Sequence, residues 1–369
     1  MNSVSIGQLN KNMIYRAIKS ISYNILNAII YYTRLIRLVN LFANHFRPNI
    51  DKKNGGTFPY IEKRRSRNVQ ILMYHKINDD HEHFFPGMPV DQFGRQMRYL
   101  SSKYSVLPLV EAVDRLKRND VPENAVVVTF DDGYKDNHVH AYPILTGLSI
   151  PATIFLATDA IGSGETLWHD NVFIAFRETR VTRLEHFGDS PGVYPLGNIE
   201  EKSDALRVVM KYLRTQDDVG RRFWIGRLIE VLQVDVKTKA AGLMMTWADV
   251  QEMHGNGISF GSHTATHAIL SRLSPEKARS EIHDSRITME KILGTPVTTF
   301  AYPNGQPEDF NKSIKEFIRD DGYVCALTTL FGANEVGEDL YEMKRGNPWE
   351  DNIPSFAVKM NWYKYRSWV

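Results

Sequence analysis

The sequence predicts an α/β fold with parallel strands, carried by residues 69–369. Short apolar runs bounded by polar residues alternate there with stretches of helical periodicity, which is typical of such a fold. The alternation stops after residue 161 and resumes near residue 246, so we expect the block 162–245 to be an insertion. Without that block 217 residues remain, about the size of one (β/α) barrel.

Each element follows from its own run of residues. The expected strands are 69–74 (VQILMY), 125–130 (AVVVTF), 151–157 (PATIFLA), 258–260 (ISF), 297–302 (VTTFAY) and 323–329 (YVCALTT). The expected helices of the body are 93–104, 138–148, 247–254, 275–293 and 310–319. Within 162–245 apolar residues recur at helical spacing, so the insert is read as helices.

The first 70 residues differ from the rest in charge. They carry 12 Lys and Arg against 2 Asp and Glu, while the remainder carries 33 against 41. We expect a helical extension over 1–46, followed by a linker over 47–68 that is rich in Pro, Gly and basic residues. Helices that pack on the body and an amphipathic membrane anchor are both open readings of the extension.

Composition excludes several classes of protein. With 43% hydrophobic and 24% charged residues the chain can bury a core, and its acidic body is a poor nucleic-acid binder. A single cysteine, Cys325, excludes a disulfide framework and a thiolate-only zinc site. The uncharged run 20–33 is too short for a spanning helix and no signal peptide is evident, so we expect a cytoplasmic protein, with peripheral contact at the inner face of the membrane left open.

Polar residues follow four of the apolar runs at the point where each run ends. They are His75, the pair Asp131 and Asp132, His263, and the segment 303–305 (PNG). Parallel strands end on one face of a barrel, so these residues are expected to converge. Two adjacent carboxylates at a buried strand end favour a cationic partner, although a helix N-cap is the plainer reading of one of them.

A metal site is the leading interpretation of the histidines in HTATH. His263 and His267 are four residues apart, and both rings face the same way in a helix or a tight turn. With an Asp from another strand end they form a set of two His and one carboxylate that leaves positions open for water and substrate. Zinc is the expected metal, with cobalt, nickel or iron as alternatives; a plain surface pair of histidines is the other reading.

TFDDGY, HTATH and YPNG, with LMYH ahead and PATIFLAT between them, resemble the polysaccharide deacetylase family of the NodB type, carbohydrate esterase family four. The resemblance implies a distorted, usually seven-stranded (β/α)7 TIM-like barrel that removes N- or O-acetyl groups from sugar polymers. By position, Asp131 resembles the catalytic base of the family. Asp132, His263 and His267 resemble its metal triad, and the backbone N–H of Asn304 resembles its oxyanion donor.

Two departures from the family pattern affect the expected roles. Ala301 stands where most members have an arginine that holds the base, and we expect Arg345 to supply the missing cation. No histidine follows His283, whereas most members have a late catalytic one. The branch that deacetylates poly-N-acetylglucosamine is similar in using a histidine after the first strand, so His75 is the expected acid, with a hydrogen-bonded core histidine as the alternative.

Substrate contacts are expected from two segments. Tyr302 and Pro303 belong to the YPNG motif, while Trp168 and Asp170 open the insert, where Trp168 could stack on a sugar and Asp170 could orient His75. An ordinary helix start with a packed Trp is the equal alternative for the second pair.

The leading function is a metal-dependent deacetylase of a polysaccharide or lipid-linked sugar. An inactive carbohydrate-binding relative and a membrane-associated component of polysaccharide assembly are the alternatives.

Overall fold

The computed structural model describes residues 20, 22–29, 31 and 68–363. The expected linker lies outside these residues except for Asn68, which begins the first strand.

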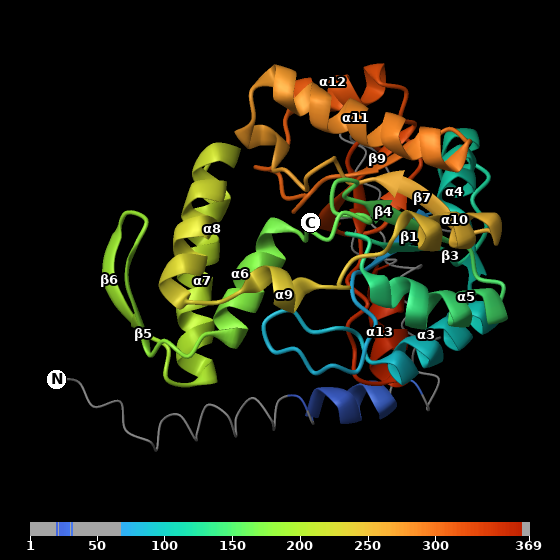
Figure 1. Ribbon diagram of the computed structural model, residues 1–369. Coiled ribbons are helices and arrows are strands. Elements are labelled where there is room, and N and C mark those ends of the chain that lie inside the picture. The colour runs from blue at the N-terminus through green and yellow to red at the C-terminus, as the bar shows by residue number, and fades with distance from the viewer. Residues whose placement is uncertain (1–19, 21, 30, 32–67, 364–369) are drawn as a thin grey trace, which may run out of the picture.

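Seven parallel strands form the barrel (Figure 1). In sheet order they are β1 (Asn68–Tyr74), β3 (Ala125–Phe130), β4 (Ala152–Leu156), β7 (Ser259–Ser262), β8 (Thr299–Ala301), β9 (Cys325–Phe331) and β11 (Met343–Arg345). A parallel bridge between Gly346 and Leu72 brings the end of β11 back to β1, and the Gly346 N–H donates to the Ile71 carbonyl at 2.7 Å. The expectation of a distorted seven-stranded barrel is therefore confirmed.

Two short strands extend the sheet at its edges. β2 (Ser105–Val106) pairs with β3, and β10 (Asn334–Glu335) runs antiparallel to β1. The helices of the barrel are α3 (Val90–Lys103), α4 (Leu109–Arg118), η1 (Asn137–Ala141), α5 (Tyr142–Gly147), α10 (Trp247–Gly255), η2 (Leu270–Arg272), α11 (Pro275–Leu293), α12 (Lys312–Asp320) and α13 (Ile353–Tyr363).

Local sequence fixes the ends of these helices. Thr246 and Asp249 form a capping box at the start of α10. Ser274 caps the start of α11 ahead of Pro275, and Gly294 ends that helix in a left-handed conformation with φ of 69°. The expected helices 247–254 and 275–293 match these two elements closely.

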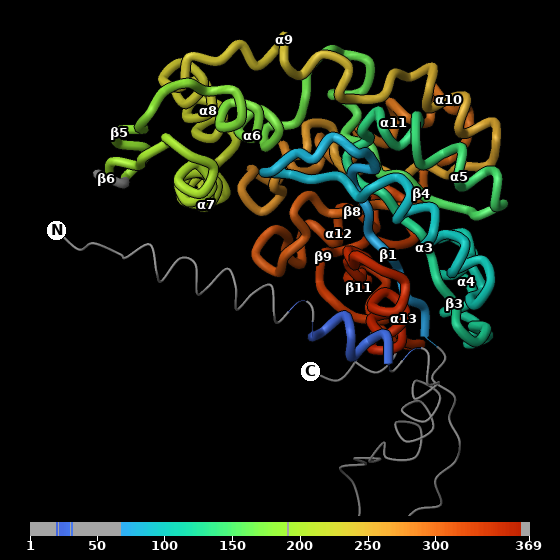
Figure 2. The backbone as a smooth tube through the Cα atoms, turned by 90° about the horizontal axis from the view of Figure 1, so that it is seen from below, coloured from blue at the N-terminus to red at the C-terminus, as the bar shows by residue number. Residues whose placement is uncertain are grey.

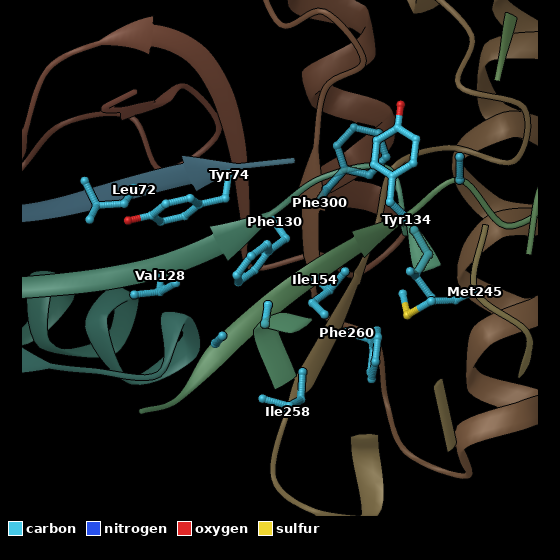
Figure 3. Close-up of a cluster of buried hydrophobic side chains, with 14 of the residues drawn as sticks. Leu72, Tyr74, Val128, Phe130, Tyr134, Ile154, Met245, Ile258, Phe260 and Phe300 are labelled. Carbon is cyan, nitrogen blue, oxygen red and sulfur yellow. The ribbon is translucent and has the colours of Figure 1, made fainter. Parts of the chain in front are cut away.

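The strands are buried on both faces, as a near-continuous apolar run predicts. Every residue of β3 is buried. Leu72, Val128 and Ile154 from three neighbouring strands belong to one cluster with the surrounding helices (Figure 3). Val127 and Leu327 belong to a second cluster. The two clusters hold the strands in place, so the residues that follow the strands have a rigid base.

The insert after β4 has a hydrophobic core of its own and projects to one side of the barrel (Figures 1 and 2). Its elements are α6 (Trp168–Glu178), β5 (Arg183–Phe187), β6 (Ser190–Pro195), α7 (Ile199–Thr215), α8 (Asp218–Leu232) and α9 (Val236–Ala240). The β5–β6 hairpin departs from the all-helical reading. Helical spacing missed it because β5 buries only Leu184 and Phe187, and because Gly188, with φ of 62°, turns the chain back.

Near the N-terminus, residues 20, 22–29 and 31 are helical and lie beside α13 (Figure 2). Ser355 of α13 accepts a hydrogen bond from Asn27 and donates one to Asn24. Among the residues that the structure describes, no helix has the length and hydropathy needed to cross a membrane.

Candidate active site

The carboxylates Asp131 and Asp132 follow β3 directly, and both are buried. The Asp131 N–H donates to the Tyr74 carbonyl at 3.0 Å, which extends the pairing of β3 with β1 to the active end of the barrel. Asp132 and Gly133 then have φ of 79° and 89°, so the chain turns sharply. A Cβ at Gly133 would lie 2.8 Å from Ile161 and Leu156 side-chain atoms, which explains the glycine after the two carboxylates.

Asp131 is paired with Arg345, which arrives from β11 on the far side of the first strand. The guanidinium donates to both carboxylate oxygens at 2.7 Å and to the Thr328 carbonyl at 2.7 Å, and it is fully buried. Burial alone would raise the pKa of Asp131, but Arg345 outweighs burial and holds that pKa below its usual range. The residue therefore carries a charge that the protein itself balances.

Asp132 lies next to histidines instead. Its Oδ1 is 3.5 Å from Nε2 of His263 and 3.3 Å from Nε2 of His267, and it has no hydrogen-bond partner. Among the described residues no Lys or Arg comes within ion-pair distance of this carboxylate. Burial would raise the pKa of Asp132, but the adjacent imidazoles, first of all His267, keep it well below its usual range. A buried, ionised carboxylate that has no cation beside it is energetically costly. This position therefore favours the binding of a cation.

The loop after β7 turns the two imidazoles toward Asp132. Nδ1 of His263 is 2.7 Å from the Ala301 carbonyl, which can only accept, so Nδ1 carries the proton and Nε2 keeps its lone pair. Burial lowers the pKa of His263 to about 4, so the ring is neutral near pH 7. Thr264 and His267 have φ of 65° and 59°, a left-handed conformation that is unfavourable for residues other than glycine. It forms the tight turn that contains His263 and His267.

These three residues fit a divalent metal. One ligand atom from each of Asp132, His263 and His267 lies within 4.8 Å of the others, and all three residues are buried. A neutral imidazole lone pair, a second imidazole and an ionised carboxylate oxygen without a partner form the donor set that zinc and similar metals take. The chemistry of the donors and the orphaned oxygen both point to a cation.

His75 follows β1 and stands on the other side of Asp131. Its Nε2 is 3.9 Å from Oδ2 of Asp131, and 30% of its side chain is exposed. The ring meets the edge of the Phe85 ring at 5.6 Å between centroids. A histidine that is partly open to solvent and lies close to Asp131 can reach a bound ligand.

A buried polar network lies beside Asp132 and His267, at the first turn of α6. Tyr134 OH lies 3.1 Å from both oxygens of Asp170 and 3.1 Å from Nε2 of His169. Thr166 and Lys76 also donate to Asp170, at 3.0 and 3.4 Å. The ring of His169 lies 4.9 Å from that of His267, and burial lowers the pKa of His169 to about 4. The network therefore packs against His267 from the insert side.

The loop after β8 also reaches this end of the barrel. Asn304 has φ of 59°, and its buried Nδ2 has no hydrogen-bond partner. Its carbonyl accepts a hydrogen bond from Thr329 at 2.5 Å, which fixes the loop. Ala301 ends β8, and its carbonyl is the group that accepts the hydrogen bond from Nδ1 of His263.

Three of the expected substrate contacts are buried in the structure. The Tyr302 ring stacks on Phe310 at 4.3 Å between centroids, and its hydroxyl donates to the Tyr341 carbonyl. Pro303 is buried as well. The buried Asp170 carboxylate accepts hydrogen bonds from Tyr134, Thr166 and Lys76. Contact with a substrate stays a prediction for all three.

Trp168, the remaining expected contact, is half-buried at the start of α6. Its Nε1 is buried without a hydrogen-bond partner, and the Arg221 guanidinium lies 5.2 Å from its ring centroid.

Sequence reasoning missed Lys76, Tyr134 and Phe85. Lys76 and Tyr134 directly extend the LMYH and TFDDG motifs, and that adjacency was the signal available for them. Phe85 lies in the loop before α3, where its ring meets those of His75, His169 and Phe173, and no pattern in the sequence marks it.

Comparison with known proteins agrees with this geometry. The family model described as polysaccharide deacetylase matches residues 118–192 and 194–326, more than half of the chain. The protein YxkH of Bacillus subtilis (strain 168), assigned to the polysaccharide deacetylases, is 24% identical over 298 residues, covering 80% of this chain and 77% of that protein.

Two solved structures share the fold. Streptococcus pyogenes deacetylase PplD, solved in complex with acetate, aligns with a TM-score of 0.54 and 20% identity over 80% of this chain and 98% of that one. IcaB from Ammonifex degensii aligns with a TM-score of 0.50 and 18% identity over 81% of this chain and 98% of that one. The family match, supported by the shared barrel, establishes that this chain belongs to the polysaccharide deacetylase family, hydrolases that act on carbon–nitrogen bonds other than peptide bonds.

Proposed function

We propose that this chain is a metal-dependent deacetylase that hydrolyses acetamide groups of a polysaccharide or of a lipid-linked sugar. The observation that carries the proposal is the division of labour between two adjacent carboxylates: Asp131 is balanced by Arg345, while Asp132 faces two imidazoles with an unpartnered oxygen. One carboxylate is thus left for a metal and the other for proton transfer. We propose N-acetyl groups rather than O-acetyl esters as the substrate because an amine leaves poorly without a proton, and His75 is placed to donate one.

Asp132, His263 and His267 would hold the metal, with zinc as the proposed ion and cobalt, nickel or iron as substitutes. A divalent cation there supplies Lewis acidity, which lowers the pKa of a water and polarises the acetyl carbonyl. Asp131 takes the proton of the attacking water as general base. The bidentate pair with Arg345 fixes the orientation of that carboxylate.

The remaining steps need an oxyanion donor and an acid. The oxygen of the attacking water bonds to the acetyl carbon, and the developing oxyanion can accept a hydrogen bond from the Asn304 N–H. The carbon–nitrogen bond then breaks, and His75 gives a proton to the leaving amine, so the products are acetate and a free amino sugar.

His75 is preferred over His169 as the acid because it is partly open and lies near the base. His169 is buried and bound to Tyr134.

Trp168 is the proposed sugar contact. Its ring is partly exposed at the start of the insert, where it could stack on the face of a sugar. Asp170, beside it in sequence, holds Tyr134 and Lys76 and is proposed as a structural residue.

Acetate release tests the function most simply. The chain should release acetate, and new free amines, from N-acetylglucosamine oligomers or from a peptidoglycan-like or lipid-linked acetylated sugar. Chelation followed by dialysis should abolish release, and added zinc or cobalt should restore it. Full activity of metal-free protein on the same substrate would contradict the metal assignment. Acetate release without new amines would point to O-deacetylation.

A further inference from the structure

The N-terminal helix, residues 20, 22–29 and 31, packs on the protein through a side that carries two asparagines and a tyrosine. Asn27 is 2% exposed, and its Nδ2 donates to Oγ of Ser355 at 3.3 Å. That hydroxyl in turn donates to Oδ1 of Asn24 at 2.9 Å. The Tyr31 ring lies 6.4 Å from the Tyr99 ring between centroids. The aliphatic residues of the helix are therefore not the ones that hold it to the protein.

The opposite side of the same helix presents apolar side chains to solvent. Ile25, Leu26 and Ile29 are 55%, 56% and 49% exposed. Ile29 is four residues after Ile25 and three after Leu26, so the three side chains lie on one side of the helix. We call Ile25, Leu26 and Ile29 the outer face. Three large apolar side chains gathered on one exposed helix face mark an interaction surface.

The neighbouring helix α13 also carries an exposed aromatic side chain. Trp362 lies seven residues, two turns, after Ser355 and therefore on the same side of α13 as the contact with the N-terminal helix. It is 46% exposed, and its ring is 5.5 Å from that of Phe331, which is 38% exposed. Tryptophan is favoured where an apolar phase meets water.

Charge identifies the partner that fits. The run 20–33 carries no charged residue, yet residues 1–67 as a whole carry 12 Lys and Arg against 2 Asp and Glu. An apolar helix face within a strongly basic segment matches an anionic bilayer surface, where apolar side chains enter the interface and cations meet lipid headgroups.

We propose that the outer face docks on the surface of an anionic phospholipid membrane, with the helix lying in the plane of the interface. The docking goes beyond the deacetylation chemistry and is independent of it, because the outer face contains no residue of the active site. It would hold the enzyme near a lipid-linked or membrane-bound glycan.

Vesicle co-sedimentation of the full chain tests the proposal. Wild type should bind vesicles of equimolar phosphatidylglycerol and phosphatidylcholine, bind phosphatidylcholine alone weakly, and dissociate as salt rises. Leu26→Glu combined with Ile25→Glu should weaken binding to the anionic vesicles by about tenfold or more. Both side chains are exposed, so the fold and acetate release from a short oligosaccharide should not change.

Val219→Asp is the matched control, because Val219 is an aliphatic residue of α8 that is 65% exposed on the insert. It should bind vesicles like wild type. Equal binding of wild type and the double variant would overturn the proposal, since the basic residues alone would then explain it. A wild-type dimer that becomes monomeric in the double variant, measured by light scattering without lipid, would instead assign the face to a second copy and also overturn it.

Discussion

The end of β3 and the first turn of α6 both bury carboxylates beneath the same end of the barrel, yet they balance the charge differently. On α6, Asp170 accepts hydrogen bonds from Tyr134 and Thr166 and pairs with Lys76. The protein itself therefore supplies both hydrogen-bond donors and a cation for this carboxylate. After β3, Asp131 has Arg345, but Asp132 has only imidazoles and one oxygen without a partner.

This difference distinguishes residues that stabilise the site from residues that are proposed to take part in the reaction. Buried charges are normally paired, and a carboxylate that the protein leaves unbalanced marks the place where a cation enters. The insert therefore contributes a fully paired polar network that packs against the site. The barrel contributes the incompletely paired carboxylate, Asp132, to which the proposed function assigns a metal ion.

The largest effect is expected at His75, on the barrel side. His75→Ala should lower turnover on an N-acetylated sugar by on the order of 10²–10⁴ while the metal content stays unchanged, because the amine leaves poorly without a proton. An activated aryl acetate has a leaving group that needs no proton, so its hydrolysis should fall much less. Steady-state rates on the two substrates, with metal analysis of each preparation, measure the effect.

His169→Ala provides the comparison for that experiment. It removes a buried imidazole from the insert side, and it should reduce amide and ester hydrolysis by similar factors. If His75→Ala affects both substrates equally and His169→Ala affects the amide selectively, the acid has been assigned to the wrong region.

Arg345 comes next. Arg345→Met should leave the buried Asp131 carboxylate without its cation and lower the free energy of unfolding by about 3–5 kcal/mol. Arg345→Lys keeps a positive charge but loses the bidentate geometry, so it should cost less. Urea denaturation at neutral pH checks both. A loss below about 1 kcal/mol for Arg345→Met would show that the pair is not what balances Asp131.

The smallest effect is expected on the insert side. Tyr134→Phe removes a hydrogen bond to the charged Asp170 and should lower the free energy of unfolding by about 1.5–3 kcal/mol, with metal content unchanged. Tyr302→Phe is the matched control, since the Tyr302 hydroxyl donates to a neutral carbonyl and should cost about 0.5–1.5 kcal/mol. Loss of metal from Tyr134→Phe would place the network inside the metal site.

How well the sequence predicted a feature depended on how far apart in the chain the contacting residues are. The strands and helices of the barrel follow from local periodicity, and the strand-end rule groups His75, Asp131 and His263 correctly at one end. Contacts between distant segments were harder. The sequence suggested Arg345 as the cation for Asp131 only because Ala301 replaces the arginine of the family pattern. The two residues are 214 positions apart and form a bidentate pair.

Burial was the feature that the sequence could not reveal. Tyr302 and Asp170 belong to segments that suggested substrate contact, yet neighbouring loops and helices bury both side chains. The outer face of the N-terminal helix shows the converse, since its apolar residues would ordinarily predict burial and stay exposed.

Metal analysis of two isosteric variants tests the central claim most directly. Asp131→Asn and Asp132→Asn change adjacent residues by the same atoms, but only Asp132 is assigned to the metal. After chelation, reconstitution with zinc and dialysis, Asp131→Asn should hold one zinc per chain and release no acetate, whereas Asp132→Asn should hold none. Zinc retained by Asp132→Asn, or lost from Asp131→Asn in a folded protein, would contradict the division of roles between the two carboxylates.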